Sequence, residues 1–426
     1  MRSGGSTGHF RRSPGQSPGD LKAAPPSRRL AGLEGRRIWF VGIGGAGLSG
    51  YAVVARAWGA EVGGWDRVDT PYLEHVRAAG IPVTIEPEPV AAPEGWECVV
   101  STAFAGRVPG RSRAELLAEL VSLQDAIVVA GAHGKTTTAG MIAFALDMLG
   151  QDPSFLIGGE ILQLGGNARA GSGWLVVEGD ESDRTIEQLR PKIAVVTNVE
   201  LDHHSEFASA AEVEELFERW LAEVPEVVRA EELQPVDFEL AVAGEHNRRN
   251  AAAALAALEL VGVAPEDAAP HLSEFAGAGR RLEERGEVGG VTLLDDYAHH
   301  PAEIEATIAA VREGRENGRV LVLFQPHLFS RTRHLARELG AVLAAADVVA
   351  VTEIYGAREE PIAGVSGKLI VDALAEARPG MVVGWAPTIE EGALFIARRA
   401  RPGDVALTVG AGDVDRAIPL LLEELA

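Results

Sequence analysis

Short apolar runs alternate with amphipathic stretches along this chain from Arg36 onward. The runs have the length and β-branched composition of buried strands, and the stretches between them have helical periodicity. This alternation predicts an α/β protein built on mainly parallel sheets. Helices are expected at 48–57, 113–122 and 209–223. Strands are expected at 38–41, 61–65, 97–100, 126–130, 174–177, 193–197, 291–294, 320–324, 348–351 and 405–409.

The length of 426 residues and the grouping of these strands predict three domains behind an N-terminal tail. Residues 1–35 are rich in Gly, Ser, Pro and Arg and have little apolar periodicity, so we expect them to be disordered. They also lack the apolar core that a signal peptide needs. The three predicted domains span residues 36–125, 126–277 and 278–426.

The composition excludes several classes of protein. Lys and Arg number 39 and Asp and Glu number 62, which gives a net charge of −23. Because duplex nucleic acids bind to positive surfaces, we expect no nucleic-acid partner. No apolar stretch approaches the length of a membrane span, and Cys98 is the only cysteine. We therefore expect a cytoplasmic protein with no membrane partner and no internal disulfide.

A glycine-rich turn follows the first expected strand. Gly42, Gly44 and Gly47 fit the pattern G-x-G-x-x-G, with Gly45 between them, and a helix is expected to follow. Such a strand–turn–helix unit aims backbone N–H groups and a helix dipole at phosphate oxygens. Taken alone, the pattern is typical of a dinucleotide fold in which Asp66, at the end of the next strand, holds a ribose hydroxyl. The glycines do not distinguish NAD from a UDP-sugar.

A second phosphate-binding turn, GAHGKTTT at 131–138, follows the strand expected at 126–130. Lys135 is expected to reach the β- and γ-phosphates of a nucleotide, and the Thr136 hydroxyl is expected to coordinate Mg²⁺. Val129 stands where the full Walker pattern has its leading glycine, so this is the shorter form of the loop. The sequence therefore predicts an ATP site with Mg²⁺.

Polar clusters follow two further strands at their carboxyl ends, where ligands lie in open α/β sheets. Glu178 ends one of these strands and is a candidate Mg²⁺ ligand, since Mg²⁺ usually takes one or two carboxylates besides phosphate and water. His203 follows the other and is a candidate for a second ion or a phosphate. An isolated histidine is more often structural, and the neighbouring Glu200 and Asp202 are what favour a site here.

Three more motifs carry candidate chemistry in the second half of the chain. Asn250 begins an Ala-rich helix and is a candidate for reading a base edge, although an ordinary helix cap explains it equally simply. Asp296 follows a strand and is a candidate for holding a ribose, with His299 near an anionic group. His327 and Arg331 follow another strand and suit a carboxylate, because arginine forms bidentate pairs with carboxylates.

These motifs, in this order, resemble those of the Mur ligases, and within that family the members that attach L-alanine to UDP-N-acetylmuramate. The resemblance covers the chain from about residue 36 to its end. Several independent motifs in the same order are far more specific than any one of them. The matching segments are 40–47, 131–138, 178–183, 197–203, 246–250, 280–281, 295–301, 325–332, 355–361 and 410–413.

The resemblance implies a three-domain Mur ligase architecture. A Rossmann-like N-terminal domain would bind the UDP substrate, a central P-loop domain would bind ATP, and a Rossmann-like C-terminal domain would receive the amino acid and close on ATP. The muramoyl carboxylate would attack the γ-phosphate of ATP to give an acyl phosphate, and the amine of L-alanine would then displace phosphate to form an amide. Metal and lysine charge aimed at the γ-phosphate would bring the two anions together.

The resemblance also implies roles for individual residues. UDP-N-acetylmuramate would be bound by Gly42, Gly44, Gly45, Gly47, Asp66 and Ser101. ATP would be bound by Gly131, His133, Gly134, Lys135, Thr136, Thr137, His246, Asn250, Arg281 and Asp296. Mg²⁺ would be held by Thr136, Glu178 and His203, and the catalytic residues would be Lys135, His203, His299, His327 and Arg331. The implied assembly is a monomer or weak dimer.

Some positions depart from the family's pattern and leave alternatives open. Ala132, Ala298 and Leu328 replace a usual Thr, Gly and Arg, and the central domain is shortened between 205 and 243. One alternative is a murein tripeptide ligase on the same UDP-sugar. Another is a nucleotide-binding, Mur-like protein with lost or altered ligase activity. A nicotinamide-dependent oxidoreductase would explain the first glycine turn but would leave Lys135 unexplained.

Overall fold

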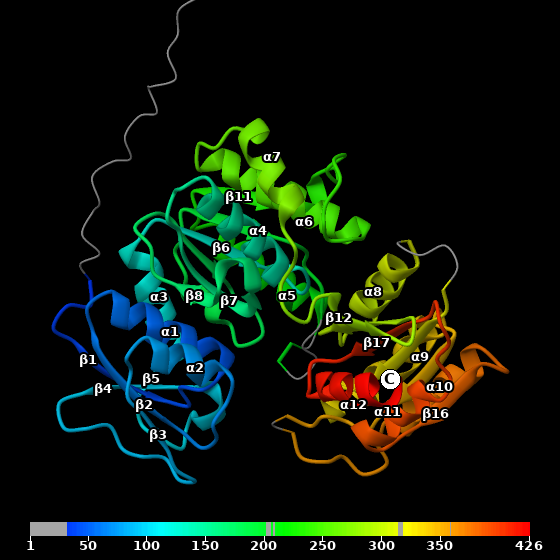
Figure 1. Ribbon diagram of the computed structural model, residues 1–426. Helices are drawn as coiled ribbons and strands as arrows, with labels where there is room; N and C mark the ends of the chain where they lie inside the picture. Colours follow the sequence, from blue (N-terminus) through cyan, green and yellow to red (C-terminus); the bar gives the residue numbers. More distant parts are fainter. Residues whose placement is uncertain (1–31, 202–205, 208, 314–317, 358) are drawn as a thin grey trace, which may run out of the picture.

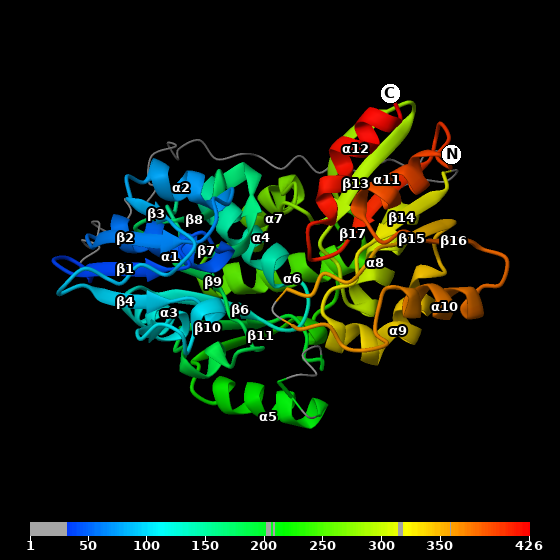
Figure 2. The same ribbon diagram turned by 90° about the horizontal axis from the view of Figure 1, so that it is seen from below.

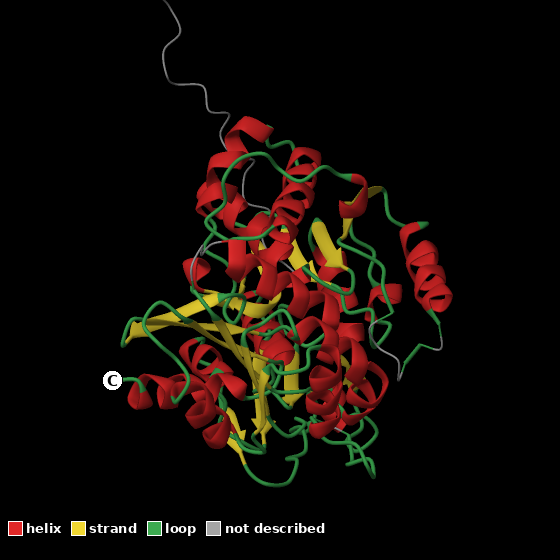
Figure 3. Ribbon diagram, turned by 90° about the vertical axis from the view of Figure 1, so that its right-hand side faces the viewer, coloured by secondary structure: helices red, strands yellow, loops and turns green. Residues whose placement is uncertain are grey.

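The computed structural model describes residues 32–201, 206–207, 209–313, 318–357 and 359–426. Figure 1 shows three bodies that follow one another along the chain, and each is built around one sheet. Helices flank the strands (Figure 3), as expected for parallel sheets whose two faces are both apolar. The predicted α/β class is confirmed. Of the residues predicted to be disordered, 1–31 lie outside the described ranges. The prediction is wrong at 32–35, because Leu33 is fully buried in the apolar core.

The first body has a five-stranded, all-parallel sheet in the order β3-β2-β1-β4-β5. The strand order changes direction at β1: β2 and β3 follow on one side of it, and β4 and β5 follow on the other. At such a switch point, the carboxyl ends of parallel strands border a crevice of the kind that holds ligands. The first glycine turn lies at the carboxyl end of β1. The elements are β1 Arg37–Val41, α1 Ala46–Ala57, β2 Glu61–Asp66, α2 Tyr72–Ala78, β3 Val83–Ile85, β4 Glu97–Val100, β5 Arg111–Ser112 and α3 Arg113–Leu123.

The central body has a six-stranded sheet in the order β11-β10-β6-β9-β7-β8, parallel except for the pair β7–β8. The short stretch between 205 and 243 still supplies the amphipathic helix α5 and the edge strand β11, which pairs with β10. The strands are β6 Ala126–Ala130, β7 Ser154–Ile161, β8 Gly166–Arg169, β9 Leu175–Glu178, β10 Ile193–Val196 and β11 Glu226–Arg229. The helices are α4 Lys135–Met148, α5 Ala210–Leu221, α6 Glu245–Leu260 and α7 Pro265–Glu274.

The third body has a six-stranded sheet in the order β12-β13-β17-β14-β15-β16, in which only β12 is antiparallel to its neighbour. The strands are β12 Glu283–Val288, β13 Val291–Asp296, β14 Val320–Phe324, β15 Val348–Val351, β16 Val382–Trp385 and β17 Val405–Val409. The helices are α8 Pro301–Glu313, α9 Phe329–Leu343, α10 Lys368–Ala377, α11 Ile389–Ala397 and α12 Ala417–Glu424.

The first two bodies share one apolar core, whereas the third has cores of its own. A single cluster of buried side chains runs from α1 and α3 into the central sheet. Helix α1 packs so closely on that sheet that a Cβ atom at Gly50 would lie 2.9 Å from the Cβ of Ala168. The buried clusters of the third body contain only residues from Leu282 onward. Domains joined by a large apolar interface are expected to move as one unit, so we expect any domain movement in this chain to be that of the third body.

Among the helices of the described ranges, none combines the length and the apolar character that crossing a bilayer requires.

Candidate active site

The phosphate loop at 131–138 joins the buried strand β6 to the start of α4. Gly131 and Gly134 have φ angles of +134° and +80°, a region that side chains rarely enter. A Cβ atom at Gly134 would also lie 2.6 Å from Oδ1 of Asn250. Both glycines are therefore required by the turn. The turn aims the first N–H groups of α4 at the space in front of the loop, as the sequence predicts for a phosphate site.

Lys135 is held by the loop itself and by a buried carboxylate. Its Nζ donates to the carbonyls of Gly131 and Ala132 and lies 3.1 and 3.2 Å from the two carboxylate oxygens of Glu181. The Glu181 side chain is only 3% exposed. Burial disfavours the lysine charge, but Glu181 and Asp180 outweigh it and raise the pKa of Lys135. Lys135 is thus charged and ready to exchange these partners for phosphate oxygens.

Thr136 and Glu178 form the oxygen-rich corner where the sequence predicts Mg²⁺. Oε1 of Glu178 accepts a hydrogen bond from the backbone N–H of Gly158 at 2.6 Å. Burial raises the pKa of Glu178, while that bond, Lys135 and the Thr136 hydroxyl oppose the rise. A carboxylate and a hydroxyl side by side are the donors that Mg²⁺ prefers. The residues therefore fit the ion, although His203, predicted as a further ligand, lies outside the described residues.

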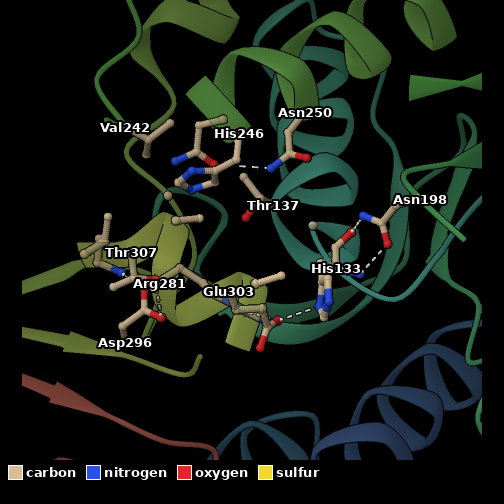
Figure 4. A pocket seen from close by; sticks show the side chains of 16 residues that line it. His133, Thr137, Asn198, Val242, His246, Asn250, Arg281, Asp296, Glu303 and Thr307 are labelled. Atoms are coloured by element: carbon tan, nitrogen blue, oxygen red, sulfur yellow. Dashed lines mark hydrogen bonds and ion pairs between the residues drawn. The ribbon is translucent and has the colours of Figure 1, made fainter. Parts of the chain in front are cut away.

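A cavity opens between the phosphate loop and the third body (Figure 4). Its walls come from the loop, from α6 and from the segment that links the central and C-terminal domains. Seven of the residues predicted to bind ATP line it: His133, Gly134, Thr137, His246, Asn250, Arg281 and Asp296. The remaining three, Gly131, Lys135 and Thr136, belong to the same loop.

Charges of both signs face each other across this cavity. Burial raises the pKa of Asp296 to about 6, and the Arg281 guanidinium opposes the rise. Both oxygens of Asp296 also accept backbone bonds, from Ala298 and Leu282 at 2.8 and 2.7 Å. Burial lowers the pKa of His246, and Arg281 adds to that effect. The cavity thus offers a fixed cation and a fixed carboxyl group to a polar ligand.

The remaining predicted catalytic residues gather at the carboxyl end of the third sheet. Arg331 Nη1 lies 3.1 Å from Nδ1 of His327, whose ring centre is 5.6 Å from that of His299. The ring of Tyr355 also stacks on that of His327, with centroids 5.9 Å apart and an interplanar angle of 15°. Leu328, at the start of α9, has a φ angle of +71°, which is unusual for a residue with a side chain. Backbone strain of this kind concentrates at functional sites.

The first glycine turn is braced by the other residues predicted there. The N–H of Gly44 donates to Oδ2 of Asp66 at 2.7 Å, and Oδ1 of Asp66 accepts from the N–H of Arg67 at 2.7 Å. A Cβ atom at Gly42 would lie 2.5 Å from Oγ of Ser101. Asp66 thus holds the turn through Oδ2, while Oδ1 is held by its own following backbone, and contact of this carboxylate with a ribose stays a prediction. Gly45 is the N-cap residue of α1. A Cβ atom at Gly47 would lie 3.3 Å from Nη1 of Arg113.

Three residues of the site were not predicted. Asn198 holds the phosphate loop by exchanging two 3.0 Å hydrogen bonds with the backbone of His133. Glu181 pairs with Lys135, and Glu303 of α8 reaches His133 from the third body at 3.2 Å. Burial disfavours the Glu303 carboxylate, but His299, His133 and Arg281 outweigh it and hold the pKa of Glu303 well below its ordinary value. The position of Glu303, two residues after Pro301 in the first turn of a helix, was the available signal.

Three family models match consecutive parts of the chain. The Mur ligase family catalytic domain matches residues 37–124, the Mur ligase middle domain 129–229, and the Mur ligase glutamate ligase domain 280–412. The chain is 38% identical to UDP-N-acetylmuramate–L-alanine ligase of Rubrobacter xylanophilus, over 91% of this chain and 100% of that protein. It is 37% identical to the enzyme of the same name from Streptomyces coelicolor, over 92% and 98%.

Solved structures agree with these sequence matches. The crystal structure of UDP-N-acetylmuramate-alanine ligase MurC from Thermotoga maritima aligns with a TM-score of 0.75 at 26% identity, covering 91% of this chain and 98% of that one. A murein peptide ligase from Psychrobacter arcticus aligns with a TM-score of 0.65 at 23% identity, covering 92% and 99%, which shows a shared fold. Together with the three bodies and their phosphate loop, these matches show that the chain belongs to the Mur ligase family.

Proposed function

We propose that this chain joins L-alanine to UDP-N-acetylmuramate, at the expense of ATP and through an acyl phosphate, in the synthesis of peptidoglycan precursors. The observation that carries the proposal is the cavity in which the phosphate loop faces Arg281 and Asp296. The relatives from Rubrobacter and Streptomyces, which match over nearly their whole length, bear the name of this activity and support the choice of substrates.

The proposed reaction has two steps. An oxygen of the muramoyl carboxylate attacks the γ-phosphorus of ATP, the bond to the β,γ-bridging oxygen breaks, and ADP leaves. The amine nitrogen of L-alanine then attacks the acyl carbon, the bond to the phosphate oxygen breaks, and the nitrogen loses a proton. Lys135 would stabilise the charge that develops on the transferred phosphoryl group. His327 and Arg331 would hold the carboxylate of L-alanine, because a guanidinium pairs well with a carboxylate.

Thr136 and Glu178 would hold Mg²⁺. When bound, the ion would neutralise phosphate charge and so let the carboxylate approach. The Gly158 N–H fixes one oxygen of Glu178, and the Thr136 hydroxyl also bonds to this carboxylate, so the two proposed ligands are held side by side. We further propose that the protein acts in the cytoplasm as a monomer or weak dimer, without a nucleic-acid or membrane partner, in line with its net charge of −23.

A phosphate-release assay tests the proposal. Purified protein with ATP and Mg²⁺ is given UDP-N-acetylmuramate, and L-alanine, glycine, L-serine or murein tripeptide is added in turn. We expect phosphate release to require the UDP-sugar and to be fastest with L-alanine. Release that is fastest with the tripeptide would assign the protein as a murein tripeptide ligase. No release with any acceptor would favour a nucleotide-binding protein without ligase activity.

A further inference from the structure

Glu303 is a buried carboxylate at the junction between the phosphate loop and the third body. Its side chain is 9% exposed, and it comes from the first turn of α8. Figure 2 shows α8 on the side of the third body that faces the central one. The third body has its own apolar cores, so contacts with the loop, such as that of Glu303 and the 5.0 Å approach of the His300 ring to that of His133, fix its position there.

The two oxygens of Glu303 have different partners. Oε2 accepts from the backbone N–H groups of His299 and His300 at 3.0 and 3.3 Å, and so caps the start of α8 as a glutamate in the third helical position often does. Oε1 points the other way, to Nδ1 of His133 at 3.2 Å and Nη1 of Arg281 at 3.6 Å (Figure 4). The cap therefore fixes the carboxylate, which leaves Oε1 aimed across the junction.

The partner of Oε1 is equally fixed. His133 lies inside the phosphate loop, and Asn198 holds its backbone N–H and carbonyl at 3.0 Å each. The second ring nitrogen of His133 lies 3.6 Å from Oε2 of Glu200, also in the central domain. The contact thus joins two rigid groups on two bodies. It exists only while the third body lies against the loop.

We propose that Glu303 is a positioning residue that holds the C-terminal domain against the phosphate loop through His133. The inference rests on the proposed function, since a Mur-type ligase must bring the amino acid to the acyl phosphate. A contact present only in the closed arrangement shifts the open–closed equilibrium toward closure. By holding Arg281 on the same oxygen, Glu303 also sets that guanidinium at the wall of the nucleotide cavity.

The test is a double-mutant cycle of Glu303→Gln and His133→Gln with full-length protein. Glutamine keeps the helix cap through its amide oxygen but removes the charge that faces His133. Glu305→Gln, which removes an exposed charge two residues further along the same helix, is the matched control. We expect each single variant to lower kcat/KM for ATP by about tenfold, within the usual range of coupling between sites. The kcat/KM of the double variant should be no lower than that of the less active single variant, because both substitutions remove the same contact.

Small-angle scattering of the ligand-free protein gives a second readout. We expect a larger radius of gyration for Glu303→Gln and for His133→Gln than for wild type or Glu305→Gln, at an unchanged melting temperature. If Glu303 served only as a helix cap, which glutamine keeps, the radius of gyration of Glu303→Gln would equal that of wild type. If Glu303→Gln does not fold, the radius of His133→Gln decides, and an unchanged value overturns the inference.

The cycle also separates this inference from the proposed function. Single effects that multiply in the double variant, while wild type remains an L-alanine-dependent ligase, would overturn the positioning role and leave the proposed function intact. A wild-type protein that releases no phosphate in the presence of L-alanine would overturn the proposed function. The scattering comparison would then still report whether the His133–Glu303 contact holds the two bodies together.

Discussion

Lys135 shows how the site stores a charge before ATP arrives. Its ammonium group pairs with Glu181 and with loop carbonyls, so the cation is desolvated but compensated. When a nucleotide binds, its phosphate oxygens would replace the Glu181 carboxylate and the loop carbonyls as partners of the ammonium group. Little reorganisation is then needed at the moment of reaction, which is the main source of electrostatic catalysis.

We expect Lys135→Ala to lower the rate of phosphate release by at least about a hundredfold, because no other described cation lies on the loop to replace it. Lys192→Ala, which removes an exposed lysine of the same domain paired with Asp125, is the control and should keep wild-type turnover. Steady-state phosphate release at saturating ATP measures both. Substantial activity in Lys135→Ala would refute the assignment of the phosphate loop.

Glu178 is the residue on which the proposed metal site depends. We expect Glu178→Gln to raise the Mg²⁺ concentration needed for half-maximal activity by at least about tenfold, since even the outer partners of metal ligands cost that much when removed. The exposed Glu215 serves as a control, and Glu215→Gln should leave the Mg²⁺ titration unchanged. A Glu178→Gln titration that superimposes on that of wild type would place the ion elsewhere.

At the scale of elements, the two glycine turns are positioned by the strands before them. In the first turn, Gly42 has a φ angle of +83°, and a Cβ atom there would lie 2.5 Å from Oγ of Ser101. Gly45 has a φ angle of −75°, and the nearest atom to its would-be Cβ is a carbonyl oxygen at 3.5 Å. A side chain would therefore be strained at Gly42 but accommodated at Gly45, although both glycines lie in the same motif.

We expect Gly42→Ala to lower the free energy of unfolding by at least about 1 kcal/mol, the cost of a left-handed backbone with a side chain. It should also raise KM for the UDP-sugar, because the turn must shift away from Ser101. Gly45→Ala should keep the wild-type unfolding midpoint. Thermal unfolding followed by circular dichroism measures the difference, and equal midpoints for the two variants would contradict it.

Much of the fold could be predicted because the central strands are continuous apolar runs. The strand expected at 126–130 is observed as β6, and every residue of it is buried. The edge strands β3, β5, β8 and β12 escaped prediction because they are short or polar: β3 and β5 have only three and two residues, β8 reads GNAR, and β12 reads EERGEV. These segments form strands because they pair with a neighbouring strand, and the local sequence of an edge strand does not show that neighbour.

The residues of the site also differ in whether their local sequence predicts their role. The phosphate loop was predictable because its chemistry is contained in eight consecutive residues, from the glycines to Lys135. Glu303 and Asn198 were not, because each acts on His133 from a distant part of the chain. A helix-capping glutamate has an ordinary explanation in its own sequence. Only the placement of α8 against the loop shows that its second oxygen has another partner.

At the scale of the whole molecule, Arg113 ties the N-terminal domain to the central domain. It begins α3, lies beside Gly47 of the first glycine turn, and pairs with Asp180 and Asp183 at 2.6 and 2.8 Å. Asp180 is next to Glu181, the partner of Lys135. A short chain of charge pairs therefore runs from the turn that would hold UDP to the loop that would hold ATP.

The Arg113–Asp180 pair predicts how the stability of the fold depends on pH. Burial opposes ionisation, but Arg113 and Lys135 outweigh it and lower the pKa of Asp180 to about 2 from an ordinary value of 3.8. A lowered pKa means that the unfolded chain binds the proton more readily, so the pair stabilises the fold above about pH 4 and loses that effect as pH falls toward 2. Because the Asp180 side chain is 38% exposed, we expect its share to be about 1 kcal/mol after allowance for screening.

Urea unfolding between pH 6 and pH 2.5 measures this share. Asp180→Asn should be less stable than wild type at pH 6, and the difference should shrink toward zero at the acid end, since protonation then removes the same charge in wild type. Asp372→Asn removes an exposed partner of Lys368 and should run parallel to wild type throughout. If the Asp180→Asn curve also ran parallel to wild type, the Arg113–Asp180 pair would contribute nothing that depends on pH, and Asp183 and packing would be what hold Arg113 at the junction.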